Sequence, residues 1–346
     1  MTKVKEKLEN YLSQVNHQIN ISEKINKGVK KLENEEKNIF KIVSYVSTIN
    51  KNKNKMNSLN RELMKSIKFS YKEEESNIKY EELYFNECFH VLKKIEKGNC
   101  ELDYGGKTQG RILFDTNTSQ VYYIDDYRSN KINIYENYNN FKSKIINKTI
   151  TLQSQISGTY SVLHKGLFYF FELKNCNKNT NNLIKYDLIQ NKILNSKTIL
   201  PDAILGNSQN IWGGYNDIIL ITDNYNLYAV YSSNNNNKRI SIAMIDENNL
   251  NVIKIWNTDS KEKNQCGPIF MINNILYHIK NYSSENDSVI YSYNLENEKS
   301  TNINIPFENK GGYDSSLTYY PDFNCLMTVN NRKIYKYNIV LDKSPS

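Results

Sequence analysis

The C-terminal part of this chain repeats short, β-rich stretches at a regular spacing. From Cys100 onward, runs rich in Val, Ile, Tyr and Phe recur about every twelve residues, and Asn, Asp and Gly separate them. This spacing predicts many short antiparallel strands joined by hairpins, which is typical of a β-sandwich or a β-propeller. Periodicity alone does not choose between the two. The expected strands are 109–114, 120–126, 130–136, 158–163, 166–172, 182–188, 216–222, 227–231, 239–245, 251–257, 268–272, 275–280, 288–293, 323–329 and 332–338.

The clearest hairpin follows a Trp-Gly-Gly-Tyr sequence at 212–215. Ile218–Thr222 is a short apolar run with the length and β-branched content of a buried strand. Asp223–Asn226 supplies turn residues, because Asp and Asn tolerate the left-handed backbone and bond their own main chain. Leu227–Tyr231 then returns as the second strand of a tight hairpin.

The run 209–231 resembles the central signature of the olfactomedin domain. Further segments resemble other parts of that family and follow the family's order over roughly residues 100–341. They are Ile132–Glu136 with Phe141, Gly158–Thr159 through Gly166–Tyr169, Ile184–Leu188, Ile255–Thr258, Tyr319–Pro321 and Ile334–Tyr337. The resemblance implies a five-bladed β-propeller, here over residues 100–346, preceded by the helical region described next.

Residues 1–99 carry a helical pattern. Two heptad positions between Val4 and Val46 are mostly apolar and the segment contains no Pro, which predicts a coiled coil over about residues 4–50. The alternative is an amphipathic helix that folds back on its own chain. We expect residues 1–99 to form a stalk that makes a homo-oligomer through residues 1–50.

Two shorter helices are expected after the coiled coil. The first carries an apolar face between Met56 and Ile67. The second spans 77–97, with Ser76 as its N-cap and Gly98 ending it. Its apolar positions include Leu92 and Ile95.

Charge and hydropathy limit the partners and the location. The formal net charge is +8, but basic residues alternate with Glu along the N-terminal helix, which is typical of a solvated face rather than a nucleic-acid interface. No apolar run is long enough for a transmembrane helix, and the charged segment Met1–Lys7 has no apolar signal-peptide core. We therefore expect no nucleic-acid partner and no membrane insertion. The resemblance implies a secreted protein, and the lack of a visible signal favours a cytoplasmic location as the alternative.

The cysteines are odd in number and lack metal-type spacing. They are Cys88, Cys100, Cys176, Cys266 and Cys325. The resemblance implies a disulfide from an N-terminal cysteine, here Cys100, to a Cys-Gly pair on a late strand. Asn273 and Asn274 occupy the positions of that pair. We therefore expect this disulfide to be missing, which favours a reducing location.

The resemblance also implies a calcium ion in the central channel, held by side-chain oxygens from three places. The corresponding positions here are Ile219, Pro268 and Thr318. Asp217 remains, but one carboxylate cannot fill the six or more oxygen positions of a hard divalent ion. We therefore expect a metal-free channel sealed by apolar or hydroxyl packing, and no cofactor.

Motifs that would carry catalysis are incomplete. Gly105–Thr108 lacks the first glycine of a phosphate loop, and Asp115–Ser119 starts like a calcium loop but continues with Gln120 instead of Gly. A hairpin turn is expected at Asp115–Ser119. The histidines form no metal or triad pattern, so catalytic residues are not expected. These histidines are His17, His90, His164 and His278.

These observations favour a non-enzymatic protein-binding module in which a helical stalk presents an olfactomedin-like propeller. The resemblance implies contact with a protein partner in extracellular adhesion, matrix organisation or receptor signalling. The alternative is an intracellular propeller scaffold that has lost the signal, the disulfide and the metal site. An enzyme with an active site in the channel is the third hypothesis, which a cluster of carboxylates or histidines at the propeller mouth would support.

Overall fold

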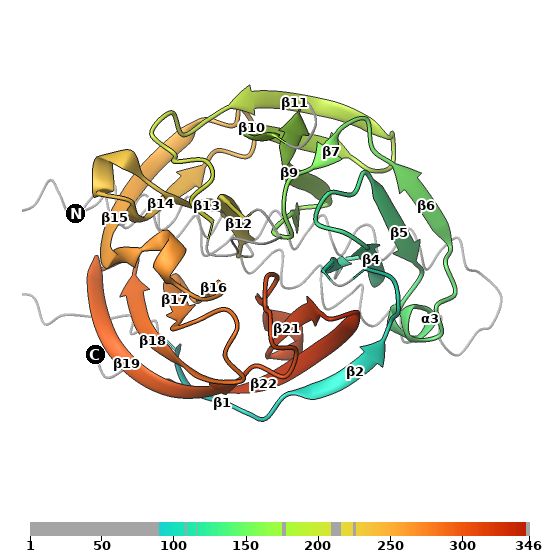
Figure 1. Ribbon diagram of the computed structural model, residues 1–346. Helices are drawn as coiled ribbons and strands as arrows, with labels where there is room; N and C mark the ends of the chain where they lie inside the picture. The colour runs from blue at the N-terminus through green and yellow to red at the C-terminus, as the bar shows by residue number, and fades with distance from the viewer. Residues whose placement is uncertain are drawn as a thin grey trace, which may run out of the picture. The chain divides into compact units, whose positions relative to one another are not determined.

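The computed structural model describes residues 90–343, except 108, 116, 175–177, 209–215 and 224–225. These residues form five antiparallel sheets arranged around a central axis as the blades of a β-propeller (Figure 1). The five-bladed propeller expected from the resemblance is confirmed. The coiled coil predicted over 4–50 and the helix predicted from Met56 lie outside the described residues.

Blades 1 and 2 follow each other along the chain, and each runs from an inner strand to an outer strand. Blade 1 contains β3 (Arg111–Asp115), β4 (Gln120–Ile124), β5 (Lys131–Tyr135) and β6 (Lys148–Thr151), with α3 (Tyr138–Lys142) between the last two. In blade 2 two short strands both pair with β9. Its strands are β7 (Gln155–Ile156), β8 (Val162–His164), β9 (Leu167–Lys174), β10 (Lys178–Asp187) and β11 (Lys192–Thr198).

Blades 3 and 4 are regular four-stranded sheets. Blade 3 contains β12 (Ile218–Thr222), β13 (Leu227–Ser232), β14 (Arg239–Ile245) and β15 (Val252–Glu262). Blade 4 contains β16 (Ile269–Ile272), β17 (Ile275–Ile279), β18 (Asn286–Asn294) and β19 (Lys299–Glu308). The short helices η1 (Asn234–Asn236) and η2 (Lys263–Gln265) lie before β14 and after β15.

Blade 5 closes the ring with strands from both ends of the described chain. Its C-terminal strands are β20 (Thr318–Tyr320), β21 (Cys325–Asn330) and β22 (Lys333–Lys343), with η3 (Pro321–Phe323) after the first. Its outer edge comes from the N-terminal side, through β1 (His90–Ile95) and β2 (Asn99–Asp103), which both pair with β22 (Figure 1). Hydrogen bonds between the two ends therefore hold the ring shut.

The helix predicted over 77–97 is wrong in its described part, because His90–Ile95 form strand β1. The pairing shifts register between Leu92 and Lys94, which marks a β-bulge. Leu92 and Ile95 are consequently both buried in the same hydrophobic cluster, between blades 4 and 5. The bulge therefore produces the three-residue apolar spacing that a helix also shows. The propeller extends N-terminal of its predicted start at Cys100.

The core of the described residues consists of hydrophobic clusters, one between each pair of neighbouring blades. Successive residues of a strand point to opposite faces of its sheet, so they enter different clusters. Ile218 and Leu220 of β12 pack between blades 2 and 3, whereas Ile219 packs between blades 3 and 4. Apolar burial on both faces of each blade makes the ring a stiff platform.

Candidate functional site

The chain approaches the inner strand of every blade from the same end of the channel, and buried polar side chains meet there. Arg111, the first residue of β3, is 2% exposed. Its Nε donates to the Ser161 carbonyl at 3.1 Å, next to β8 of blade 2. Its Nη1 donates to the Ser316 carbonyl at 3.1 Å and to the Thr318 hydroxyl, both in the approach to blade 5. The guanidinium carbon lies 5.5 Å from the centre of the Tyr160 ring. Arg111 therefore ties blades 1, 2 and 5 together.

Asn216, just before β12, makes a second link across the channel. Its Oδ1 accepts a hydrogen bond from the Thr159 N–H at 2.8 Å, and its Nδ2 donates to the Ser315 carbonyl at 2.9 Å. Lys263 on η2 is completely buried, and its Nζ donates to the Asn216 carbonyl at 2.5 Å. The segments that lead into blades 2, 3, 4 and 5 are thus joined.

Two carboxylates are buried beside this network. Asp217 Oδ2 accepts from the Gly206 N–H at 2.8 Å. Burial lowers the pKa of Lys263 to about 8, and the negative charge of Asp217 opposes this shift. Asp314 Oδ1 accepts from the Thr328 hydroxyl at 2.6 Å, and burial raises the pKa of Asp314 to about 6. Two basic and two acidic side chains therefore share this end of the channel.

The three positions that correspond to the family's calcium ligands do not fit a calcium ion. Ile219 is packed between blades 3 and 4. The Pro268 ring offers no ligand, and its carbonyl accepts from the Ile279 N–H at 3.0 Å. The Thr318 hydroxyl accepts from Arg111, whose fixed positive charge repels a cation. A hard divalent ion needs six to eight oxygen ligands, and these residues do not supply them.

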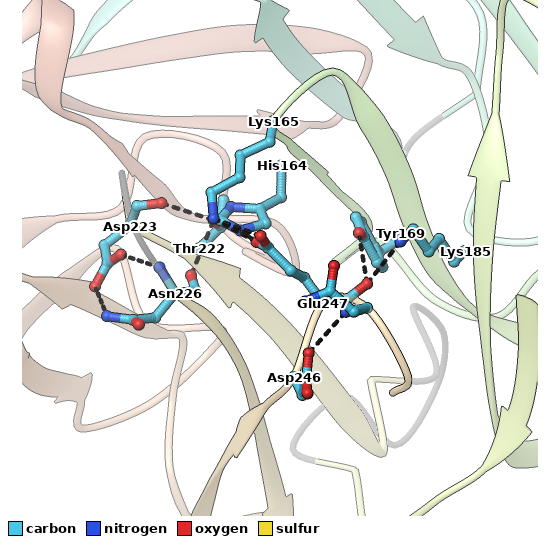
Figure 2. Close-up of polar contacts among 10 residues, drawn as sticks. His164, Lys165, Tyr169, Lys185, Thr222, Asp223, Asn226, Asp246 and Glu247 are labelled. Atoms are coloured by element: carbon cyan, nitrogen blue, oxygen red, sulfur yellow. Dashed lines mark hydrogen bonds and ion pairs between the residues drawn. The ribbon is translucent and has the colours of Figure 1, made fainter. Parts of the chain in front are cut away.

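The other end of the inner strands carries a second polar cluster, between blades 2 and 3 (Figure 2). His164, the last residue of β8, is buried; its Nε2 lies 2.7 Å from Glu247 Oε2 and its Nδ1 lies 2.6 Å from the Thr222 hydroxyl. Lys165 donates to both Glu247 carboxylate oxygens at 2.6 Å. Burial lowers the pKa of His164, and the hydrogen bond to Glu247 opposes this shift.

In this cluster the Thr222 hydroxyl, the His164 imidazole and the Glu247 carboxylate follow one another as the nucleophile, the general base and the orienting carboxylate do in a catalytic triad. The Thr222 hydroxyl, however, also contacts the carbonyls of Asp223 at 2.8 Å and Asn226 at 3.1 Å, which hold it inside its own hairpin turn. The cluster is therefore assigned as a link between blades. Sequence analysis missed it because the partners of His164 lie 58 and 83 residues away along the chain.

Several predicted local features can be located. Cys100 is exposed, Cys266 and Cys325 are buried, and all three are free. Asn273 and Asn274 have φ of 49° and 61° and form the two-residue turn between β16 and β17. Such a turn needs positive φ at both positions, which Asn tolerates. The two strands of the hairpin predicted at 218–231 are confirmed, because β12 and β13 pair antiparallel, with Ile218 opposite Tyr231. Residues 224–225 of its turn lie outside the described residues.

The hairpin turn predicted after β3 is also confirmed. β3 and β4 pair from Arg111 to Asp115, and Asp115 lies opposite Gln120. The Asp115 carboxylate accepts from the Asn117 N–H at 3.0 Å and from the Thr118 hydroxyl at 2.9 Å. These bonds stabilise a turn within one hairpin.

Aromatic rings gather at the surface where α3 and η3 meet β3. The Phe114 ring centre lies 4.8 Å from that of Phe323, 5.0 Å from that of Tyr320 and 5.8 Å from that of Tyr138. Phe323 is 41% exposed. Lys142 Nζ lies 4.9 Å from the centre of the Tyr138 ring. We call Phe114, Tyr138, Tyr320 and Phe323 the aromatic surface cluster.

Comparison with known proteins gives matches to solved structures and to a family model. One of the matching structures, the crystal structure of the Myxococcus xanthus glutaminyl cyclase, is 7% identical; the match covers 74% of this chain and 98% of that chain, with a TM-score of 0.43. The family model of the olfactomedin-like domain matches residues 83–344, which include every strand described above. The chain therefore belongs to the olfactomedin-like domain family.

Proposed function

We propose that this protein is a non-enzymatic protein-binding module that acts outside the cell, in adhesion, matrix organisation or receptor signalling. Membership of the olfactomedin-like family supports this proposal. The ring also supports it, because a stiff β-propeller holds its surface loops in fixed positions. In this proposal the propeller contacts the partner protein, and self-association of the N-terminal segment brings several propellers into one assembly.

The observation that carries the proposal is the aromatic surface cluster. Phe323 exposes 41% of its surface on a turn, and Phe114 and Tyr138 beside it are half-buried. Aromatic side chains are enriched in the centres of protein interfaces, where they bury large apolar areas at low entropic cost. We assign the protein partner to this cluster.

The test compares Phe323→Ser with a matched control. Ile189 lies in the turn between β10 and β11 of blade 2 and is 90% exposed, so Ile189→Ser removes a similar apolar surface elsewhere. The wild type, Phe323→Ser and Ile189→Ser are each cross-linked to their neighbours in the natural host. The partner proteins recovered in this way are then purified, and their affinity for each of the three proteins is measured. The partner should bind the wild type and Ile189→Ser equally, and Phe323→Ser at least tenfold more weakly. Equal affinity for all three would overturn the assignment.

The N-terminal segment is proposed to self-associate through residues 1–50. Linked copies of a weak binding surface gain avidity through effective concentration. Light scattering should show an oligomer for the full-length chain and a monomer for a chain that starts at Asn86, which retains β1 and β2. A monomeric full-length chain would contradict this part of the proposal.

The second candidate is an intracellular propeller scaffold. The free thiols of Cys100, Cys266 and Cys325 favour it, because exposed free thiols such as that of Cys100 persist best in reducing compartments. Among the described residues no helix has the length and hydropathy to cross a membrane. Fractionation of the natural host with an antibody to the propeller separates the candidates: protein in the medium supports the first, and protein confined to the cytosol supports the second.

A further inference from the structure

The channel contains two buried, positively charged side chains of the protein. Arg111 and Lys263 are both buried, and each donates to oxygens of segments that lead into other blades. We propose that Arg111 and Lys263 are built-in cations, which cross-link the blades in place of a bound metal ion and make the propeller independent of divalent cations.

The contacts of Arg111 carry the first part of this inference. Its guanidinium holds the carbonyl oxygens of Ser161 and Ser316 and the hydroxyl of Thr318. A metal ion would gather oxygens of this kind from several strands. The planar guanidinium does so with directed N–H donors and a charge that is never lost.

The contacts of Lys263 carry the second part. Its ammonium group is fully buried and holds the Asn216 carbonyl, while Asn216 reaches Thr159 and Ser315 with its side chain. Lys263 therefore connects the approach to blade 4 with a network that spans blades 2, 3 and 5. Arg111 lies at the start of blade 1. The hydrogen-bond networks of Arg111 and Lys263 together therefore reach all five blades.

Charge balance argues against a metal in addition to these side chains. All four side chains, those of Arg111, Lys263, Asp217 and Asp314, are buried; the charge of Asp217 acts on Lys263, and the charges of Arg111 and Asp314 both act on the buried Tyr160. A divalent ion would add two positive charges without added anions, and uncompensated buried charge is strongly unfavourable. The two positively charged side chains thus already match or exceed the carboxylates in number of charges, and no excess negative charge is left for a divalent ion.

The first experiment measures thermal midpoints of the full-length protein in excess EDTA and in millimolar calcium. The inference expects identical midpoints, and elemental analysis should find no stoichiometric calcium in purified protein. Arg111→Met should lower the midpoint by about 10 °C, because several charge-assisted hydrogen bonds are lost. The matched control is Arg239→Met, at an exposed position on blade 3, which should shift the midpoint by less than about 2 °C. Bound calcium, or a midpoint that falls in EDTA, would overturn the inference.

The second experiment restores the missing cation. Arg111→Ala removes the guanidinium donors from the oxygens of Ser161, Ser316 and Thr318. Methylguanidinium at low millimolar concentration should therefore raise the midpoint of Arg111→Ala and leave that of the wild type unchanged. An Arg111→Ala protein that melts like the wild type would show that the guanidinium does not hold the blades. If neither Arg111 variant folds, the calcium analysis and the EDTA arm on the wild type decide the question.

Discussion

His164 Nε2 and Glu247 Oε2 are 2.7 Å apart, although the first residue ends the inner strand of blade 2 and the second lies in a turn of blade 3. The His164 side chain is almost fully buried and Glu247 also accepts from Lys165 (Figure 2). Removing one partner of a buried polar pair leaves the other unsatisfied, which costs more than the pair itself contributes.

We expect Glu247→Ala to lower the free energy of unfolding by about 2 kcal/mol, because His164 loses its carboxylate inside the protein. Glu298→Ala is the control: Glu298 pairs with Lys254 at 2.8 Å, but both side chains are about half exposed. An exposed pair contributes about 0.5 kcal/mol or less. Urea unfolding of both variants measures the difference, and equal losses would contradict the assigned role of His164.

The pH dependence of stability should contain a contribution from His278. Burial lowers the pKa of His278 to about 4, from 6.5 in the unfolded chain, and its ring stacks on Tyr291. Between these two values the unfolded chain holds a proton that the folded chain lacks, so stability falls as the pH drops from 6.5 to about 4. The full loss is about 3 kcal/mol.

His278→Phe keeps a ring against Tyr291 and removes this titration. Urea midpoints from pH 4 to pH 7 should therefore fall less steeply for His278→Phe than for the wild type. Parallel pH profiles for the two proteins would show that His278 does not titrate as its burial requires.

The contribution of Asp314 to stability should change with pH in the direction opposite to that of His278. Burial raises the pKa of Asp314 to about 6, from 3.8. In that window the folded chain holds a proton that the unfolded chain has released, so the Asp314 contribution to stability falls as the pH rises from 3.8 to about 6. We expect Asp314→Asn to be more stable than the wild type at pH 7.5, by about 2 kcal/mol, and to have no such advantage at pH 3.8.

The control for Asp314→Asn is Asp322→Asn, an exposed aspartate on η3. It should leave the urea midpoint unchanged at both pH values. A loss of stability in Asp314→Asn at pH 7.5 would mean that the ionised carboxylate stabilises the channel.

Strand β1 should be needed for a stable ring. A chain that starts at Glu96 lacks the side chains of Leu92 and Ile95, which are buried between blades 4 and 5. It also lacks the hydrogen bond from the Leu92 N–H to the Tyr277 hydroxyl at 3.0 Å. Compared with a chain that starts at Asn86, we expect a loss of several kcal/mol in urea unfolding. Equal stability would show that β1 is dispensable.

Most inner and middle strands of the blades could be predicted from the sequence, whereas the outer strands β6, β11 and β19 and the short inner strand β20 could not. All six residues of β13 are buried, so an apolar run marks the strand. In β11 every second residue is exposed and the others are only partly buried, and Leu194 is 43% exposed. An outer strand packs weakly on both faces, so its sequence carries little apolar signal. The β1 strand was predicted as a helix because its bulge imitates helical spacing.

The channel network could not be predicted because its members depend on distant parts of the chain. An arginine at the start of a short strand, such as Arg111, ordinarily indicates an exposed end. Its partners Ser161 and Ser316 lie 50 and 205 residues away. The resemblance identified the positions where metal ligands are missing, but only the folded ring shows which side chains meet there.

The closure of blade 5 has a consequence for synthesis of the protein. Within the described residues, β1 and β2 pair only with β22, so the first strands to leave the ribosome wait for the last. The ring cannot close during translation, and its final step joins residues as far apart as His90 and Lys343. Contacts of such high sequence separation form slowly. Until then Leu92 and Ile95 remain uncovered, and this interval is when chaperones and aggregation compete for the new chain.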